Sequence, residues 1–491
     1  MPPSRRTQVY LPSILFLFFW LLYQFTAVRA FSYDGLCYAL DVEFAPPANL
    51  FHPNHLLYTF VSYGLWRFFH ALGYAGRAIY LMQSVNAFVA AGAVICFYGT
   101  LRRRMAEIPA AAGAVLFGVS HAFWSEAVDP GCYAWAALAT VLLMELLLRP
   151  EIGAFRAGLA HGVLTLFHQM LILVVPAFAI EYAADFGFYA VGLAVGAGLP
   201  YALIAAFYHG SSFRDALFWA LGPAGPPPGV AIMSHYWWST RLGADLAIWW
   251  GAFIESVTAL PQETVIRWIL EGLISAAAGW GIYKSLKDQP PNRQDRKPWL
   301  ALWIWVLILN VFQFFFYPGA LRYRILFLPP LIYLIAPPAL PFKRTLLWVG
   351  SAGILFGLAL LNFQNSIYPR MLSNVEADRA AWVRQELGPQ DFFLFDGRGP
   401  DSIVNVYMAY FAPDRRARSL SGYLFEHSDG NLTSLMETLN GAQRAGGRIF
   451  VESAVLDAPE LKAWKGRLNP LEWSIGPDGY RIARVRWAQA R

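Results

Sequence analysis

Tyr33–Glu43, YDGLCYALDVE, and Phe51–Tyr58, FHPNHLLY, are the two segments from which the fold can be predicted. They follow the first long apolar run, Val9–Val28, which has the ~20-residue length that a bilayer core requires of a helix. We therefore expect both segments to lie at a membrane surface. Together they carry three carboxylates and two histidines, so we expect candidate site residues at this surface.

The composition of the whole chain favours an all-α polytopic membrane protein. Of 491 residues, 57% are hydrophobic and only 14% are charged. Apolar runs of about 20 residues recur, and a helix satisfies its own backbone hydrogen bonds inside lipid. The formal net charge of +6 does not indicate a nucleic-acid partner, because the basic residues fall in short loops between apolar runs, where they set orientation.

The segment His55–His70 decides the membrane topology. Its apolar residues recur at helical spacing on one face, and its polar residues lie largely away from that face. This pattern favours interfacial helices in the first outer loop over a spanning helix. The next apolar run, Ala78–Leu101, then places Arg102, Arg103 and Arg104 on the cytoplasmic side, as positive-inside bias requires. Continuing this alternation predicts about eleven transmembrane helices.

We expect the membrane domain to span residues 1–363 and a second domain to span residues 364–491. The tail is charged and contains no run of membrane length. Its residue pattern predicts helices at Asp378–Leu387 and Leu432–Ala445, and short buried strands at Asp391–Phe395 and Arg448–Glu452. The sequence therefore predicts a small extracytoplasmic α/β domain.

Three carboxylates in outer segments are candidate catalytic residues. Asp34 follows the first helix directly, and a carboxylate between aromatic residues at the edge of a low-dielectric region can act as a general base or hold a cation. Glu126 and Asp129 lie in the next outer turn, where either can face the same cavity. The alternative for each is a structural role as a solvated helix cap, with Pro130 beside Asp129.

Candidate substrate-binding residues lie in the first outer loop. Asn54 and His55 stand at the start of the amphipathic helix, after His52 and Pro53, and the free N–H groups at such an end suit a phosphate. The alternative is an ordinary helix N-terminus, at which Pro and Asn serve only to start the helix. The two histidines can also bind a metal, but a His-x-x-His pair in a loop is weak evidence for one.

Three more side chains are candidate ligands from later outer turns. His168 interrupts an apolar segment, so it either faces a ligand or is a hydrogen-bonded buried histidine. Arg322 and Arg324 lie in the last outer turn of the membrane body, where a guanidinium beside a cavity can bind phosphate or pyrophosphate. Snorkelling to lipid headgroups is the alternative. We expect Asp34 and Arg322 to share one water-filled pocket at the membrane boundary.

The chain resembles the GT-C membrane glycosyltransferases that use polyprenyl-phosphate sugars, particularly the protein-O-mannosyltransferase-like branch. The resemblance rests on the order of several short motifs. They are Asp34 just after the first helix, His52-Pro53-Asn54-His55 before an amphipathic helix, Phe123-Trp124-Ser125-Glu126-Ala127 with Tyr133, His168-Gln169, and Arg322-Tyr323-Arg324. Together they cover most of Met1–Leu340.

The resemblance implies a hexosyl- or pentosyltransferase that moves a sugar from a polyprenyl-phosphate donor to a glycan, lipid or protein acceptor. It implies an inverting single displacement with Asp34 as the base and with an arginine and the first outer loop on the lipid phosphate. A divalent cation, Mg²⁺ or Mn²⁺, is the expected cofactor. The expected location is a bacterial inner (plasma) membrane, with the active site and the C-terminal domain on the extracytoplasmic side. Membrane lipid is an expected partner, and nucleic acid is not.

The sequence departs from the family pattern at the second acidic position. Relatives often carry an acid soon after the first Asp, where this chain has Leu36-Cys37. Many also carry an acid before the tyrosine of the second motif, where this chain has Gly131-Cys132. Glu126 and Asp129 are the candidates to substitute for it, and the second acidic role stays open. The three cysteines (Cys37, Cys96 and Cys132) form neither a metal-binding spacing nor a disulfide framework, and we expect them to be unpaired.

Two functions of other classes compete with glycosyl transfer. A transporter or lipid flippase predicts charged residues buried within spans and paired broken helices in two corresponding halves. Here the charges collect in outer loops, and no two-half symmetry is visible. A non-catalytic membrane protein of envelope assembly predicts that the outer acidic residues do not converge.

Overall fold

The computed structural model describes residues 7–149, 151–209, 219, 242–260, 265–287, 293–336, 345–397, 403–420, 433–459, 461, 468–476 and 481–487. The chain divides into two compact units. The larger comprises Met1–Val28 and Asp41–Pro369, and the smaller comprises Arg29–Leu40 and Arg370–Arg491. The change at Pro369 falls close to the change of character at residue 364. The assignment of residues 29–40 to the smaller unit has no counterpart in the sequence pattern.

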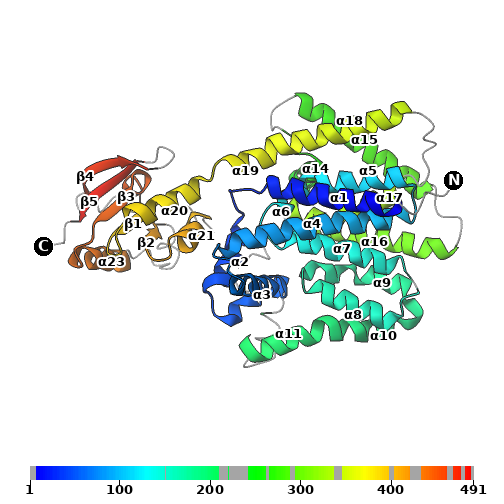
Figure 1. The fold of residues 1–491 in the computed structure, drawn as a ribbon, viewed down its shortest axis with the longest axis horizontal. Helices are drawn as coiled ribbons and strands as arrows, with labels where there is room; N and C mark the ends of the chain where they lie inside the picture. Colours follow the sequence, from blue (N-terminus) through cyan, green and yellow to red (C-terminus); the bar gives the residue numbers. More distant parts are fainter. Residues whose placement is uncertain are drawn as a thin grey trace. The chain divides into compact units, whose positions relative to one another are not determined.

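The larger unit is helical throughout its described residues (Figure 1). Its α-helices are α1 (Thr7–Phe25), α2 (Tyr33–Phe44, which begins in the smaller unit), α3 (Tyr58–Ala71), α4 (Ala78–Arg102), α5 (Glu107–Val119), α6 (His121–Ala127), α7 (Tyr133–Leu147), α8 (Ala154–Thr165), α9 (Val175–Glu181), α10 (Phe186–Leu193), α11 (Leu199–Ile204), α14 (Leu242–Val257), α15 (Val265–Lys287), α16 (Arg293–Phe316), α17 (Leu328–Ile335), α18 (Thr345–Asn362) and α19 (Tyr368–Leu372, which ends in the smaller unit). Short 3-10 and π segments are η1 (Pro47–Leu50), η2 (Pro53–His55), η3 (Gln169–Val174), η4 (Ala183–Asp185), η5 (Ala194–Gly198), η6 (Ala205–His209), η7 (Arg322–Leu326) and η8 (Phe363–Ile367). Helix α4 packs against α1, α5 and α7 at the centre of this bundle.

The described helices include several that suit a bilayer. Three are long and apolar enough to cross a membrane, Ala78–Arg102, Ala183–Tyr208 and Arg296–Phe316, and a fourth results if α5 and α6 count as one bent span. Shorter apolar helices cover Tyr10–Phe25, Tyr133–Leu147 and Gln169–Glu181. The mostly helical body with a small C-terminal sheet is confirmed, while the number of about eleven spans and their orientation stay predictions.

One predicted span, Ile108–Trp124, is broken in the structure. Helices α5 and α6 meet at an angle of 64°, with the intervening Ser120 in an extended conformation. The break frees backbone carbonyls that need new donors. The hydroxyl of Ser120 donates to the carbonyl of Phe117 at 2.7 Å, and the amide of Asn362 donates to the carbonyl of Val119 at 2.7 Å. Polar side chains therefore stabilise a bend that the apolar pattern did not reveal.

Helix α3 supports the interfacial assignment of the first outer loop. Its 14 residues extend only about 21 Å, too short for a ~30 Å bilayer core. Thr59 and Ser62 on its polar side are buried against protein, whereas Phe60 and Phe68 on its apolar side are 45% and 59% exposed. Such an exposed apolar face suits contact with lipid.

Helices α8 and α10 pack with almost no space between their backbones. A Cβ atom added at Gly158 would lie 2.0 Å from the carbonyl oxygen of Tyr189, and one at Gly192 would lie 2.2 Å from that of Phe155. Gly162 and Gly196 meet one turn further along the same contact. Small residues at four-residue spacing allow this close approach, which is typical of helix pairs in membranes.

Helix α14 differs from the sequence prediction. The sequence predicts a long outer segment rich in Pro, Gly and Trp at His209–Gln262. Within it, Leu242–Val257 is helical and packs against α6 and η7. Apart from His209 and Trp219, the part of this segment before Leu242 lies outside the described residues.

The smaller unit contains a five-stranded mixed sheet. Its elements are α20 (Val375–Glu386), β1 (Phe392–Phe395), α21 (Ile403–Phe411), β2 (Arg416–Ser419), α23 (Thr433–Arg444), β3 (Ile449–Glu452), α24 (Ser453–Leu456), β4 (Leu468–Ile475) and β5 (Arg481–Trp487). The strand order is β2-β1-β3-β5-β4. β1 is parallel to β2 and β3, while β5 is antiparallel to β3 and β4.

Helices cover both faces of this sheet because its interior strand β1 is apolar on both sides. Phe392 and Leu394 pack with α23 and α24, whereas Phe393 and Phe395 pack with α20 and α21. Successive side chains of a strand point to opposite faces, so a continuous apolar run indicates a strand buried on both. The predicted α/β character of the tail is confirmed.

The segment that carries Asp34 is tied to the C-terminal part of the smaller unit. The N–H groups of Arg29 and Ala30 donate to the carbonyl of Arg370 at 2.8 and 3.0 Å. The N–H of Phe31 donates to the hydroxyl of Tyr407 at 2.8 Å, and the amide of Asn374 donates to the same hydroxyl at 2.6 Å. The C-terminal residues thus fix the backbone just before Asp34.

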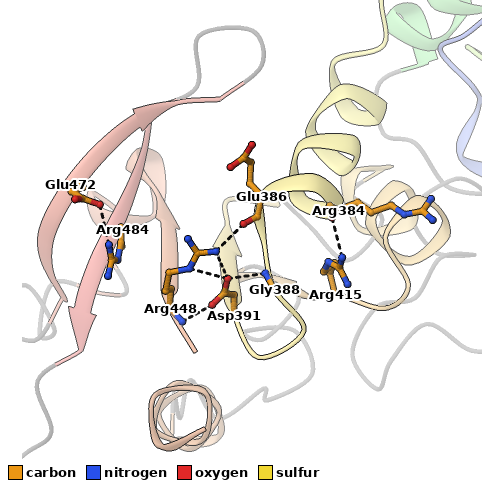
Figure 2. Close-up of polar contacts among 8 residues, drawn as sticks. All are labelled: Arg384, Glu386, Gly388, Asp391, Arg415, Arg448, Glu472 and Arg484. Atoms are coloured by element: carbon orange, nitrogen blue, oxygen red, sulfur yellow. Dashed lines mark hydrogen bonds and ion pairs between the residues drawn. The ribbon is translucent and has the colours of Figure 1, made fainter. Parts of the chain in front are cut away.

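Asp391 connects the loop after α20 to the start of β3 (Figure 2). Its carboxylate accepts from the backbone N–H of Arg448 at 2.6 Å, from the guanidinium of Arg448 at 2.7 and 3.0 Å, and from the N–H of Gly388 at 2.8 Å. Burial raises the pKa of Asp391, but these hydrogen bonds from Arg448 and Gly388 outweigh it and hold the pKa below its usual value. The carboxylate is therefore a structural anchor.

We expect Asp391→Asn to destabilise the smaller unit by roughly 2–4 kcal/mol. The amide NH₂ of asparagine would face the N–H donors of Gly388 and Arg448, which need an acceptor. The control is Glu472→Gln, since Glu472 is 70% exposed in its pair with Arg484 and exposed pairs contribute about 0–1 kcal/mol. A depressed pKa means that the stabilisation is present above the unfolded-state pKa and is lost as the pH falls. Thermal unfolding of both variants checks this, and equal losses would contradict it.

Candidate functional site

The turn before α7 is held by polar side chains of α3 and α4. The amide of Asn86 donates to the carbonyls of Asp129 and Gly131 at 2.8 and 2.5 Å, and Gln83 donates to the carbonyl of Val128 at 2.7 Å. The hydroxyl of Tyr58 donates to the carbonyl of Pro130 at 2.7 Å. These contacts place the following residues, Cys132 and Tyr133, at a fixed position. Sequence reasoning missed Gln83 and Asn86, although polar residues three apart in an apolar helix were a usable signal.

Four segments far apart in the sequence bring together what we call the imidazole–arginine cluster: His55, Tyr133, His168 and Arg322. The rings of His55 and His168 lie 4.7 Å apart between centroids, and those of Tyr133 and His168 lie 5.3 Å apart. The guanidinium carbon of Arg322 lies 5.4 Å from the centroid of Tyr133, within cation–π range. Three predicted ligand-binding residues therefore converge around one tyrosine.

The cluster has a consistent electrostatic character. Burial, together with the nearby charge of Arg322, lowers the pKa of His168 to about 3. The pKa of His55 is also lowered, mostly by burial and to a smaller extent by the charges of His168 and His52. Both imidazoles are therefore neutral at physiological pH, and Arg322 is the permanent charge of the cluster. A guanidinium beside neutral donors attracts an anion.

Arg324 has a different position from Arg322. It is fully buried, and its guanidinium donates to the carbonyls of Trp249 and Pro318 at 2.9 and 2.8 Å while lying 5.5 Å from the Trp249 ring. Burial lowers its pKa to about 10. These contacts join η7 to α14, so Arg324 acts in holding the turn that presents Arg322.

Glu126 and Asp129 lie at the end of α6 and in the turn after it. Glu126 is half-buried and Asp129 is almost fully buried. The N–H of Asp129 donates to the carbonyl of Glu126 at 3.4 Å, which places both acids in the turn that Asn86 and Tyr58 hold. A catalytic role for either stays a prediction.

The predicted amphipathic helix His55–His70 begins at Tyr58 as α3, and the three-residue 3-10 turn η2 precedes it. The N–H of His55 donates to the carbonyl of His52, and that of Leu57 donates to the carbonyl of Leu166, both at 3.0 Å. These two N–H groups already donate within the protein, so neither is available to a phosphate. His52 occupies the N-cap position of η2 without a side-chain capping bond, and Asn54 is exposed.

The acids on α2 differ in environment. Asp34 is half-buried in the first turn, within the smaller unit. Glu43 accepts from the N–H of Ala78 at 2.5 Å and from Arg77 at 2.7 Å, so it caps the N-terminus of α4. The expectation that Asp34 shares a pocket with Arg322 stays a prediction, because the two belong to different units.

Asp41, also on α2, gives a pH prediction. Burial raises its pKa to about 6, so the folded state binds its proton more tightly than the unfolded state. Stability should therefore fall as the pH rises from about 4 to about 6. We expect Asp41→Asn to raise the melting temperature at about pH 8 and to leave it unchanged at about pH 4. Thermal melts at both values check this, and a larger gain at low pH would contradict it.

A polar cavity of about 500 Å³ lies between α6, the end of α14 and η8. Its lining residues include His121, Glu255, Gln364, Asn365 and Ser366. The two ring nitrogens of His121 contact the carbonyl of Glu255 and the hydroxyl of Ser366, each at 2.8 Å. Amide, carboxylate and hydroxyl groups can all bind a ligand rich in hydroxyl groups. Sequence reasoning missed this cavity, because α14 was not predicted.

Mg²⁺ and Mn²⁺ prefer carboxylate, carbonyl and water oxygens. Among the described residues, the group of three or more metal-binding side chains that converge is His55, Cys132 and His168, with no carboxylate among them. A possible cation site is therefore present, but its nitrogen and sulfur donors do not suit the hard cations expected from the sequence.

Two solved proteins share this fold over 98% or more of this chain. ArnT from Cupriavidus metallidurans, bound to undecaprenyl phosphate, matches at a TM-score of 0.59 and 11% identity, covering 98% of both chains. The archaeal oligosaccharyltransferase AglB from Archaeoglobus fulgidus, in complex with an inhibitory peptide and a dolichol-phosphate, matches at a TM-score of 0.52 and 11% identity. That match covers 99% of this chain and 75% of AglB.

The apo form of the Archaeoglobus fulgidus oligosaccharyltransferase matches at a TM-score of 0.52 and 13% identity, over 92% of this chain and 70% of that one. No family model and no curated protein sequence matches the chain. At these identities the likeness establishes the fold. The resemblance to GT-C glycosyltransferases is thereby confirmed at the level of the fold.

Proposed function

We propose that this chain is a membrane glycosyltransferase that transfers a sugar from a polyprenyl-phosphate donor to an acceptor on the outer face of the membrane. The observation that carries the proposal is its fold, which it shares over 98% of both chains with ArnT bound to undecaprenyl phosphate. Fold alone does not specify chemistry, so the role of each residue depends on its position in the site.

The phosphate of the donor is proposed to bind at Arg322. Its guanidinium is half-buried and lies over the ring of Tyr133, beside the neutral imidazoles of His55 and His168. An arginine in partly desolvated surroundings binds a phosphate through paired, charge-assisted hydrogen bonds. Such bonds strengthen as negative charge develops on the leaving phosphate. They therefore raise the rate of transfer in addition to holding the donor.

The proposed reaction is a single displacement at the anomeric carbon. The acceptor hydroxyl oxygen forms a bond to that carbon while the bond from carbon to phosphate oxygen breaks. The phosphate leaves with the electron pair, and the hydroxyl proton passes to the carboxylate of Asp34. This sequence inverts the anomeric centre. Glu126 or Asp129 is proposed as the second acid, a role that the family pattern places near Tyr133.

The polar cavity beside His121 is proposed to hold the hydroxyl groups of the sugar or of the acceptor. It offers an amide from Asn365, a hydroxyl from Ser366 and a carboxylate from Glu255. Hydroxyl groups both donate and accept hydrogen bonds, so a mixture of donors and acceptors suits them. The sugar is proposed to be a hexose or a pentose, and the acceptor a glycan, lipid or protein.

A direct assay tests the proposed function. The full chain, purified in lipid nanodiscs, is incubated with a panel of radiolabelled polyprenyl-phosphate sugars and candidate acceptors. The expected result is release of polyprenyl phosphate together with a labelled product, in equal amounts. Movement of intact lipid-linked sugar across the bilayer without bond cleavage would contradict the proposal and support a flippase.

A further inference from the structure

Three side chains of metal-binding type meet inside the larger unit. His55 comes from η2, Cys132 immediately precedes α7, and His168 immediately precedes η3. One donor atom of each lies within 4.8 Å of the others. Their exposed fractions are 6%, 0% and 3%, so water has little access to them. Because 77 and 36 residues separate them along the chain, the fold alone brings them together.

We propose that His55, Cys132 and His168 bind one transition-metal ion of borderline softness, with Zn²⁺ as its representative. Two imidazole nitrogens and one thiolate sulfur form a donor set that suits Zn²⁺ and disfavours Mg²⁺ and Mn²⁺. A tetrahedral Zn²⁺ with bonds of ~2.0–2.3 Å separates its ligand atoms by roughly 3.3–3.8 Å. The three donor atoms therefore have to close by no more than roughly 1.5 Å.

The backbones that carry the three ligands are already fixed around the proposed site. The N–H of Leu57, two residues after His55, donates to the carbonyl of Leu166, two residues before His168, at 3.0 Å. The amide of Asn86 holds the carbonyl of Gly131, next to Cys132, at 2.5 Å. Supports of this kind orient metal ligands and raise affinity.

Binding of the ion has two local consequences. The thiol of Cys132 releases its proton to solvent and becomes a thiolate, which cancels one of the two positive charges of the ion. The Nδ1 atom of His168 accepts from the N–H of Met170 at 3.2 Å. If His168 coordinates through Nε2, its proton moves to Nδ1 and this single hydrogen bond is given up.

The site would also keep an open position. Three protein ligands leave the fourth tetrahedral place to an outside ligand, as in catalytic zinc sites. The guanidinium carbon of Arg322 lies 5.4 Å from the centroid of Tyr133, whose ring centroid lies 5.3 Å from that of His168, so an anionic oxygen is the favoured fourth ligand. The metal proposal does not depend on sugar transfer, and its test is independent of activity.

Metal content is the direct test. The full chain in lipid nanodiscs is stripped with a chelator, incubated with Zn²⁺, dialysed and examined by elemental analysis. We expect about one Zn²⁺ per chain, unaffected by excess Mg²⁺ or Mn²⁺. Co²⁺ in place of Zn²⁺ should give the visible absorption of a tetrahedral thiolate site, which Zn²⁺ then removes. Failure of wild-type protein to retain zinc, or equal displacement by Mn²⁺, would overturn the proposal.

Variants locate the ion. Cys132→Ser keeps the volume of the side chain and should weaken Zn²⁺ binding at least ~10-fold, as should His168→Gln. Cys37→Ser and Cys96→Ser are matched controls, because these cysteines lie outside the cluster, and both should keep full binding. Thermal melts of the stripped proteins identify any variant that does not fold. Full zinc affinity in folded Cys132→Ser, or its loss in Cys37→Ser, would place the ion elsewhere.

Discussion

Replacing Asp34 by asparagine is expected to abolish sugar transfer, because the amide cannot take the proton of the acceptor hydroxyl. Loss of a general base typically lowers a rate by roughly 10²–10⁴-fold. The side chain is half-buried at the start of α2, so the change should leave the fold intact. The measurement is single-turnover transfer with saturating donor, together with a thermal melt of the same preparation.

The matched control for this prediction is Asp41→Asn, which makes the same chemical change on the same helix. Asp41 lies about two turns further along α2, and we assign it no role in transfer. Donor binding should survive in Asp34→Asn, since the base acts after the donor is bound. Turnover near the wild-type rate in Asp34→Asn would remove Asp34 from the mechanism, and equal losses in both variants would indicate a structural effect.

Replacing Arg322 by glutamine is the second large expected effect. The guanidinium is the permanent positive charge of the imidazole–arginine cluster, so its loss should lower kcat/KM for the donor by roughly 10²–10³-fold, as the loss of a charge-stabilising donor does in other enzymes. Arg322→Lys should recover part of this activity, because lysine keeps the charge and loses the paired hydrogen bonds. Steady-state kinetics with varied donor checks both expectations.

Two further arginines serve as comparisons for Arg322. Arg156 is exposed at α8, so Arg156→Gln should have normal kinetics and stability. Arg324 is fully buried against Trp249 and Phe327, so Arg324→Gln should lower the melting temperature as well as activity. An Arg322→Gln variant that unfolds like Arg324→Gln would assign Arg322 a structural role.

The competing transporter and scaffold functions make opposite predictions for these variants. A flippase would lose lipid movement in Arg322→Gln. It needs no general base, so Asp34→Asn would leave lipid movement unchanged. A non-catalytic assembly protein would show no turnover in any of them. The described residues contain a buried arginine, Arg324, but its bonds to the carbonyls of Trp249 and Pro318 serve a turn and are not paired across two halves.

The sequence by itself determined the helical apolar body and the mixed character of the tail. These features depend on short-range patterns: run length, 3.6-residue periodicity and the alternation of a strand. The same patterns identified His55, His168 and Arg322 as polar residues at the ends of apolar segments. A polar residue at such a boundary is visible locally, whatever it later contacts.

Only the tertiary structure decided which of these residues meet. Cys132 joins His55 and His168, although its spacing in the sequence predicted no metal site. Arg324 turns to backbone carbonyls while Arg322, two residues away, faces the cluster. The segment before Asp34 pairs with Arg370 and Tyr407, some 340–376 residues later. Such contacts depend on how whole helices pack and where they bend, and that packing has no period in the sequence from which to predict it.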